Sequence, residues 1–217
     1  MVADAQEIPK EVDPKDVVSK MKFDYTRGVR DHSTRALEAV NELCASLEKQ
    51  DLNIDVFLKQ TAELISKHFG ISSVAIGVRD PVDRMYKYRV VVGLDDSVAE
   101  GYKALTYSRQ QLFDNKTYPS HDISSRTKLF LSEDHPYADG EEFTYKSPRL
   151  IGLKRRSLTD SLEADYIDVL FFGSGGDIIG FIEASGTRLR KLPDVITIKW
   201  LELISCIIGA FLRARRY

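Results

Sequence analysis

The sequence has little cysteine and almost no net charge. Only two cysteines, Cys44 and Cys206, occur among its 217 residues, which excludes a disulfide framework or a cysteine-rich metal site. Because both lie at apolar positions of predicted helices, we interpret them as small buried hydrophobic residues in a reducing compartment. The formal net charge is −2, so no overall field recruits nucleic acid, and we expect no nucleic-acid partner.

Membrane and secretion signals are also missing. No run approaches the roughly 18 apolar residues of a membrane span, and the acidic and polar start MVADAQEIPKEVD lacks a signal-peptide profile. We therefore expect a cytoplasmic protein without a membrane partner. Hydrophobic residues make up 43% of the chain and charged residues 29%, which is typical of a globular domain rather than a disordered chain.

The beginning of the chain differs from the rest. Residues 1–32 carry seven acidic and six basic side chains with few apolar anchors, which predicts a solvated tail or a linker. Within it, the segment from Lys15 to Met21 has the pattern of a short helix behind Asp13-Pro14. We expect residues 33–217 to form one domain.

Two helices are predicted at the start of this domain. Apolar residues recur at helical spacing after Ser33, which predicts a helix that ends near Gln50. A second helix follows, with Asn53 as its N-cap and Gly70 placed to terminate it.

A third helix is predicted near the carboxyl end, from about Asp194 to Arg213. Its apolar stripe, which includes Leu201, Ile204 and Ile208, is wider than packing on one sheet requires. Because a helix that is apolar through so wide an arc is not left in water, we expect part of it to pack against a second copy, giving a homodimer through the terminal helices.

Strand patterns follow the second helix. Residues 71–79 place Val74, Ile76 and Val78 on one face and small residues on the other, and residues 85–92 form the return strand of a hairpin. Further on the pattern weakens, with short helices predicted over 96–103 and 108–114 and short strands over 104–107 and 130–131. Residues 132–162 show almost no periodicity. A loop of this length in a compact domain is usually functional or disordered, and it could act as a lid over a cavity.

The strongest signal is the stretch YIDVLFFGSGGDIIGFIEASG, residues 166–186. Two apolar runs flank the glycine-rich segment 173–176, which predicts an antiparallel hairpin. Pairing outward from that turn predicts four cross-strand pairs: Phe172 with Asp177, Leu170 with Ile179, Asp168 with Phe181, and Tyr166 with Glu183. One strand face then has no polar side chain and holds Ile167, Val169, Phe171, Ile178, Gly180 and Ile182. The other is apolar with two carboxylates and holds Tyr166, Asp168, Leu170, Phe172, Ile179, Phe181 and Glu183.

This mixed face predicts a ligand-binding pocket. Asp168 and Glu183 could anchor a cationic or hydrogen-bonding ligand beside Tyr166, Phe172 and Phe181, whose rings offer stacking. The alternative is that the middle segment simply covers the face. In that case the buried carboxylates need partners, and the arginines that could supply them are Arg126, Arg155 and Arg188.

Catalytic and metal sites receive little support. Paired carboxylates can act as general acid and base, but no other catalytic group accompanies them. The spacing of His68, His121 and His135 matches no metal or haem motif. The glycine-rich turn lacks the Lys and Ser/Thr of a phosphate loop and leads into a strand. We therefore predict no catalytic residues, no metal site and no enzyme activity, and the cofactor is left unknown.

The order of elements, two helices, a hairpin, an irregular middle, a second hairpin and a long terminal helix, resembles the GAF domain. The segment SLTDSLEADYIDVLFFGSGGDIIGFIEASGTRLRKLPDVITIKWLELISCIIGAFL looks like the GAF modules of archaeal sensory histidine kinases, and TYPSHDISSRTKLFLSEDHPY is similar to them. The resemblance covers residues 35–213. It implies an α+β fold with a six-stranded antiparallel sheet, the N- and C-terminal helices on one face and a ligand pocket on the other.

The resemblance also implies a function. We expect a small-molecule-sensing module in signal transduction, with a histidine kinase or another signalling domain as a possible partner. No phosphoacceptor-histidine helix and no ATP-binding glycine boxes occur here, so this chain alone is not a kinase. One GAF branch reduces free methionine sulfoxide with cysteines in the middle loops, where this sequence has none. The second hypothesis is a ligand-free dimerisation module.

Overall fold

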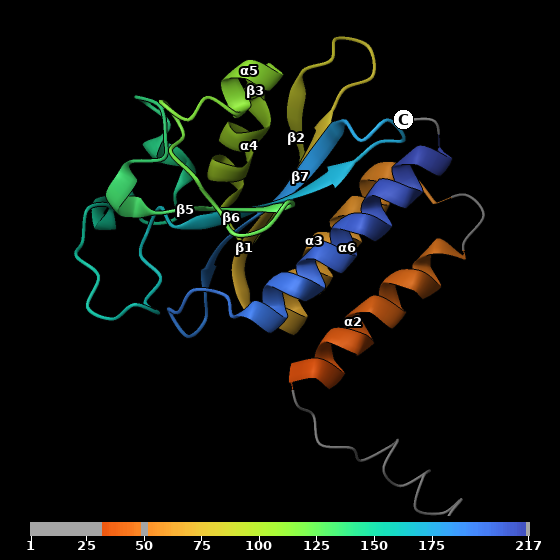
Figure 1. The fold of residues 1–217 in the computed structure, drawn as a ribbon, viewed down its shortest axis with the longest axis horizontal. Coiled ribbons are helices and arrows are strands. Elements are labelled where there is room, and N and C mark those ends of the chain that lie inside the picture. Colours follow the sequence, from red (N-terminus) through yellow and green to blue (C-terminus); the bar gives the residue numbers. More distant parts are fainter. Residues whose placement is uncertain (1–31, 49–51, 216–217) are drawn as a thin grey trace, which may run out of the picture.

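The structure is a computed structural model that describes residues 32–48 and 52–215. The predicted tail lies outside the described residues up to position 31, so the division into tail and domain stays a prediction. Nearly all of the predicted domain is described, and its elements form the layers seen in Figure 1.

One antiparallel sheet of seven strands lies at the centre of the molecule, in the order β3-β2-β1-β7-β6-β5-β4. The strands are β1 (Ile71–Arg79), β2 (Tyr86–Val92), β3 (Thr106–Tyr107), β4 (His121–Asp122), β5 (Thr127–Phe130), β6 (Tyr166–Phe172) and β7 (Ile178–Thr187). The expected number was six. Both edge strands, β3 and β4, are only two residues long, and β4 carries no apolar alternation that a sequence pattern could reveal.

Helices cover the sheet unequally. The α-helices are α2 (His32–Leu47), α3 (Ile54–Phe69), α4 (Asp96–Ala104), α5 (Arg109–Leu112) and α6 (Val195–Ala214). Three short 3-10 turns lie between β5 and β6, namely η1 (Ser132–Asp134), η2 (Glu142–Thr144) and η3 (Pro148–Leu150). The long helices α3 and α6 lie side by side on one face with α2 packed against them, whereas the short helices and turns lie on the other (Figure 1).

The ends of α3 follow the predicted capping chemistry. Asn53 accepts a hydrogen bond from the backbone N–H of Asp55 at 2.8 Å, and Gly70 ends the helix with a φ of 65°, a left-handed conformation that glycine adopts without a Cβ penalty. Both predictions are confirmed. At α6, the side chain of Asp194 accepts from the N–H of Thr197 at 2.8 Å, which fixes the start of that helix.

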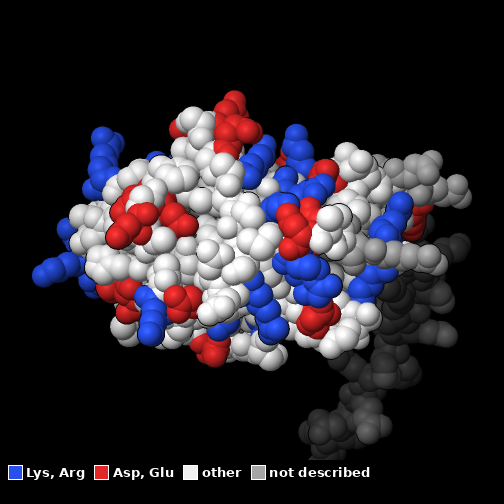
Figure 2. Space-filling view, turned by 90° about the horizontal axis from the view of Figure 1, so that it is seen from above, with Lys and Arg blue, Asp and Glu red and all other residues white. Residues whose placement is uncertain are grey.

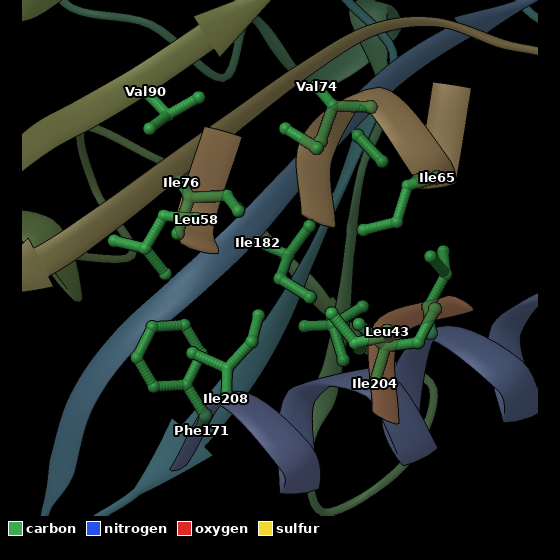
Figure 3. Packing of buried hydrophobic residues seen from close by; sticks show 14 of the residues in the cluster. Leu43, Leu58, Ile65, Val74, Ile76, Val90, Phe171, Ile182, Ile204 and Ile208 are labelled. Atoms are coloured by element: carbon green, nitrogen blue, oxygen red, sulfur yellow. The ribbon is translucent and has the colours of Figure 1, made fainter. Parts of the chain in front are cut away.

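The helix-covered face carries an aliphatic core. Ile204 and Ile208 of α6 and Ile65 of α3 point toward Ile76 and Ile182 of the sheet (Figure 3). Each of these side chains is at most 1% exposed. Full burial of an aliphatic side chain of this size contributes about 1.5–3 kcal/mol, so this layer holds the terminal helices on the sheet.

The prediction that both cysteines are buried is wrong. Cys44 and Cys206 are free and exposed. In α2 the buried stripe consists of Ala36, Ala39 and Leu43, and Cys44 lies beside that stripe. An apolar residue next to a core stripe falls outside it when the helix packs along a narrower line than the sequence pattern indicates.

Helix α6 is long and strongly apolar. By length and mean hydropathy alone it suffices for a membrane span, contrary to the expectation that no run in the chain approaches one. In the structure, however, its residues Leu201, Ile204, Ile208 and Leu212 are buried within the domain core.

The register predicted for the β6–β7 hairpin is wrong by two residues. Asp168 lies opposite Glu183 rather than Phe181, and Tyr166 lies opposite Ser185. Two causes add up to this shift. The loop is one residue longer than predicted, because Phe172 pairs with Ile178 rather than Asp177, and a β-bulge before the next pair, Phe171 and Gly180, shifts the register by one further residue.

A shift by two leaves most residues on the predicted face. Ile179, the extra residue of the bulge, and its neighbour Ile178 exchange faces: Ile179 packs in the helix-side core and Ile178 on the opposite side. The division into a wholly apolar face and a face with two carboxylates is therefore as predicted elsewhere along the hairpin.

Candidate functional site

The face away from the long helices is packed with tyrosine. Its buried cluster contains Ala75, Tyr86, Tyr88, Tyr102, Tyr107, Leu170 and Phe181. A bulge at Arg89 in β2 turns Tyr86 and Tyr88 to this face, while Val90 stays in the helix-side core. Gly77 makes room for the layer, since a Cβ there would lie 2.4 Å from the Phe181 ring. Local irregularities of the strands thus place the aromatic side chains.

Two carboxylates lie within this cluster. Asp168 and Glu183 face each other directly across β6 and β7 and are only 6% and 8% exposed. Glu183 accepts hydrogen bonds from the hydroxyls of Tyr88 at 2.6 Å and Tyr102 at 2.8 Å. By contrast, the buried Oδ1 of Asp168 has no hydrogen-bond partner among the described residues. A buried acceptor without a donor is costly, by about 1–3 kcal/mol, and rare in native proteins.

Burial and neighbouring negative charge shift the ionisation of the pair. Desolvation, and then the charge of Glu183, raise the pKa of Asp168 well above its ordinary value, and the charge of Lys128 opposes them. Desolvation also raises the pKa of Glu183, although the hydrogen bonds from Tyr88 and Tyr102 act in the opposite direction. Desolvation and the neighbouring carboxylate charge therefore disfavour two full negative charges at this position, whereas Lys128 and the two tyrosine hydroxyls favour ionisation.

A third carboxylate comes from the irregular segment. Glu141 accepts hydrogen bonds from the hydroxyl of Tyr107 at 2.9 Å and from that of Tyr118 at 2.9 and 3.0 Å. Its charge adds to the raised pKa of Glu183. Burial raises the pKa of Tyr107 and Tyr118 as well, so their hydroxyls stay protonated and able to donate.

Three hollows adjoin these groups. A cavity of about 30 Å³ lies against Glu183 and Glu141, and a second of about 20 Å³ lies against Asp168 and Glu183; we call these two the inner cavities. A larger outer hollow of about 170 Å³ is lined by Asp122 and Lys128 among others. Tyr118 lines all three. Since about 10–15 Å³ holds one water, the inner cavities have room for a water-sized species.

The irregular segment 132–162 covers this face and is tied down at several points. Thr144 and Tyr145 are buried, and the hydroxyl of Tyr166 donates to the carbonyl of Pro136 at 3.1 Å. Arg155 anchors the far part of the segment through contacts of 2.9 Å with both Glu133 and Asp165. Anchoring by individual side chains leaves no periodic pattern in the sequence, so the sequence of this segment predicts no regular element.

Solved structures share this architecture. The GAF domain of a phosphoenolpyruvate-protein phosphotransferase from Coxiella burnetii has a TM-score of 0.55 at 11% identity, covering 85% of this chain and 98% of that one. Residues 122 to 287 of a methyl-accepting chemotaxis protein give 0.50 at 12%, with coverage of 77% and 92%.

The chain has the GAF fold.

A third similar structure is fRMsr of Staphylococcus aureus in its reduced form, with a TM-score of 0.50 at 15% identity and coverage of 85% and 97%. The sequence matches no protein-family model and no curated protein. Sequence identities of this size relate the chains by fold alone. The particular resemblance to archaeal kinases stays a prediction.

Within the GAF fold, three of the five predicted ligand residues line the inner cavities. These are Tyr166, Asp168 and Glu183. Phe181 lies behind the cavities, where its ring packs edge-on against Tyr88 with centroids 5.5 Å apart. Phe172 lies at the end of the hairpin, where Arg126 covers its ring at 4.8 Å.

The arginine partners proposed for the carboxylates are not found in the described part of the chain. Arg155 pairs with Asp165 and Glu133, Arg126 stacks on Phe172, and the aliphatic part of Arg188 lies near Gly70. Tyrosine hydroxyls take their place at Glu183. The middle segment does cover the face, as that alternative expected.

Sequence reasoning missed most of the tyrosines. Seven of the chain's ten tyrosines line the inner cavities, and only Tyr166 among them was predicted. The other six are widely spaced in the sequence: Tyr88, Tyr102, Tyr107, Tyr118, Tyr137 and Tyr145. They come from two strands, a helix and the connecting segments, so no local pattern joins them. The only signal in the sequence was the ratio of ten tyrosines to a single tryptophan.

Other candidate features lie apart from this site. His121 pairs with Asp134 at 2.8 Å, His135 contacts Tyr137 and His68 lies near Glu42, and no group of three or more potential metal-ligating side chains forms within residues 32–48 and 52–215. Acidic and basic side chains are interspersed over the surface in Figure 2. A groove of about 490 Å³ between α2 and α3 is bordered by exposed Glu63 and Lys67 and by Gln60, whose buried Oε1 has no hydrogen-bond partner among the described residues.

Proposed function

We propose that this chain is a small-molecule-sensing module of a signalling protein and that its ligand binds between the sheet and segment 132–162. The observation that carries this proposal is the unpartnered Oδ1 of buried Asp168 at the wall of a cavity. A ligand that donates a hydrogen bond there would remove an energetic cost that the free protein bears. The presence of GAF folds in chemotaxis proteins supports a role in signalling.

The same strands offer a route from ligand to helices. Asp168 and Glu183 lie on the cavity side of β6 and β7, while Ile167, Val169 and Ile182 of these strands pack in the helix-side core. A ligand that shifts β6 against β7 would therefore change the packing of α6. The signal can be no larger than the difference between the ligand's binding free energies for the two arrangements.

Native mass spectrometry tests the binding proposal. We expect the purified chain to retain a small molecule that is lost on denaturation and that does not copurify with the Asp168→Asn variant. Asp177→Asn, a carboxylate-to-amide change at the turn of the same hairpin, is the matched control and should retain the molecule. Failure to find any bound molecule, together with no thermal shift from a library of metabolites, would overturn the proposal.

We further propose that the chain has no catalytic activity of its own and works in the cytoplasm. Both of its cysteines lie on helices of the opposite side, α2 and α6, which supports the absence of cysteine chemistry at the cavities. The burial of the α6 stripe in the core supports a soluble location.

A second candidate function is helix-mediated assembly. Val195, Ile196 and Leu203 of α6 are 72%, 47% and 42% exposed, which favours a homodimer through the terminal helices, alone or with a histidine kinase or other signalling domain as partner. Light scattering would show a dimer that Leu203→Glu converts to a monomer. A strictly monomeric wild-type protein would remove this candidate and leave the sensor proposal intact.

A further inference from the structure

We propose that the inner cavities are a site for a small ammonium-type cation, the size of NH₄⁺ or methylammonium, held by Asp168, Glu183 and the surrounding tyrosines. The inference rests on the proposed sensing function and names the class of its ligand.

The charge around the cavities favours a cation. Asp168 and Glu183 line one inner cavity, Glu183 and Glu141 line the other, and within the described ranges no Lys, Arg or His forms an ion pair with any of them. Lys128 lies opposite Asp168 across β5 and β6, but its ammonium group contacts Asp122 at 2.7 Å. Buried carboxylates without a counterion are strongly disfavoured, and a bound cation would supply one.

The hydrogen-bonding groups around the inner cavities are mainly acceptors. The Oδ1 of Asp168 is buried and has no donor in the described structure. Tyr88 and Tyr102 donate their hydroxyl protons to Glu183, so toward a ligand their hydroxyl oxygens can act only as acceptors. An ammonium group has only donors, so it complements this set of acceptors, whereas an anion or a carbonyl group would not.

The walls of the inner cavities are aromatic. Tyr88 and Tyr102 meet edge to face with centroids 4.9 Å apart, and five further tyrosines complete the lining: Tyr107, Tyr118, Tyr137, Tyr145 and Tyr166. Aromatic walls attract cations through the ring quadrupole, most strongly where water is excluded. Tyrosine-lined cavities next to carboxylates are therefore suited to ammonium groups.

Volume limits the ligand further. Cavities of about 30 and 20 Å³ admit one or two water-sized groups, which matches NH₄⁺ or methylammonium and is too small for a quaternary ammonium ion. Tyr118 lines the outer hollow and both inner cavities, so we expect the ligand to approach through the outer hollow. Lys128 lies in that hollow, where its positive charge would oppose an arriving cation.

The test is an NMR titration of the ¹⁵N-labelled chain at pH 8 with ammonium chloride and with methylammonium chloride at constant ionic strength. We expect saturable shifts confined to residues around the cavities, and none with sodium chloride or tetramethylammonium chloride. Asp168→Asn and Glu183→Gln should each weaken binding at least about tenfold, the worth of one charge-assisted hydrogen bond. Lys128→Met should tighten binding, since it removes a repelling charge.

Controls keep this test decisive. Asp177→Asn should bind as the wild type does, and the thermal transition of each variant shows whether it is folded. Equal shifts with sodium chloride, or unchanged binding in Asp168→Asn, would overturn the inference. If neither ammonium salt binds but native mass spectrometry finds another molecule that Asp168→Asn loses, the cation inference fails and the sensing proposal stands. If no small molecule binds at all, both fail.

Discussion

The two faces of the sheet differ although the same strands build them. On one side Ile182 and Val169 are completely buried among aliphatic side chains. On the other, their neighbours Glu183 and Asp168 are almost as deeply buried, but with a partly unsatisfied pair of carboxylates. One face is therefore optimised for stability, whereas the other retains an unfavourable charge arrangement. Such a cost inside a folded domain is typical of a functional site.

The largest expected effect lies on the helix-covered face. Ile182→Ala removes a fully buried side chain from the layer beneath α6 and should lower the free energy of unfolding by about 2–5 kcal/mol, through lost burial and the cavity left behind. Urea denaturation measures it. A loss below about 1 kcal/mol would show that this face is not the close-packed one.

The carboxylate face should respond in the opposite direction. Asp168→Asn preserves shape, removes the buried charge and supplies an N–H₂ donor, so we expect a gain of about 1–3 kcal/mol at neutral pH without ligand. The same urea experiment measures the gain, with Asp177→Asn as the control. Destabilisation by Asp168→Asn alone would contradict the distinction between the faces.

The pH dependence follows from the same carboxylate. Because the folded pKa of Asp168 is raised above 3.8, the folded state binds more protons than the unfolded state above that pH. Its contribution to stability is present below about pH 4 and is lost as pH rises toward the folded pKa, by up to about 1.4 kcal/mol per pH unit.

The groups that face Asp168 shape this dependence. Glu183 on β7 also has a raised pKa, so its ionisation lowers stability with rising pH as that of Asp168 does. Lys128 on β5 lowers the pKa of Asp168 and so weakens the dependence. The pKa values of Tyr88 and Tyr166 are raised well above their ordinary values, so neither hydroxyl titrates between pH 4 and 8. Denaturation between pH 4 and 8 should therefore show the advantage of Asp168→Asn increasing with pH. An advantage that is constant with pH would exclude ionisation as its cause.

The smallest effect is expected from a single hydroxyl. Tyr102→Phe removes one donor to Glu183 and should cost about 1 kcal/mol while raising the pKa of Glu183. Tyr137→Phe, whose hydroxyl contacts the exposed side chain of His135, is the control and should cost less in the same denaturation assay. Equal losses of unfolding free energy in the two variants would mean that the hydrogen bond to buried Glu183 stabilises the fold no more than an exposed one.

Much of the fold could be predicted because its signals are local. The caps of α3, the alternation of β1 and the hairpin at the carboxyl end each depend on neighbouring residues. The bulges at Arg89 and Ile179 could not be predicted, since each arises from pairing with another strand. These bulges determine on which face of the sheet Tyr86, Tyr88 and Ile178 lie, and therefore which side chains surround the cavities.

The candidate site could be predicted only in part for the same reason. Asp168 and Glu183 lie on one hairpin, where alternation alone placed them on a common face. Tyr102, Tyr118 and Tyr145 reach that face from elements far apart in the sequence, and only tertiary packing brings them together. Exposure of Cys44 and Cys206 likewise depends on how the helices rotate against the core, which their apolar periodicity does not define.

The most direct test of the account is a ¹³C NMR titration of the side-chain carboxyl of Asp168, with and without methylammonium. We predict a midpoint well above 3.8 in the free protein, because of burial beside Glu183, and a lower midpoint when methylammonium is present, because a bound cation favours the ionised form. A midpoint near 3.8 that methylammonium leaves unchanged would contradict both the unfavourable buried charge and its role in binding.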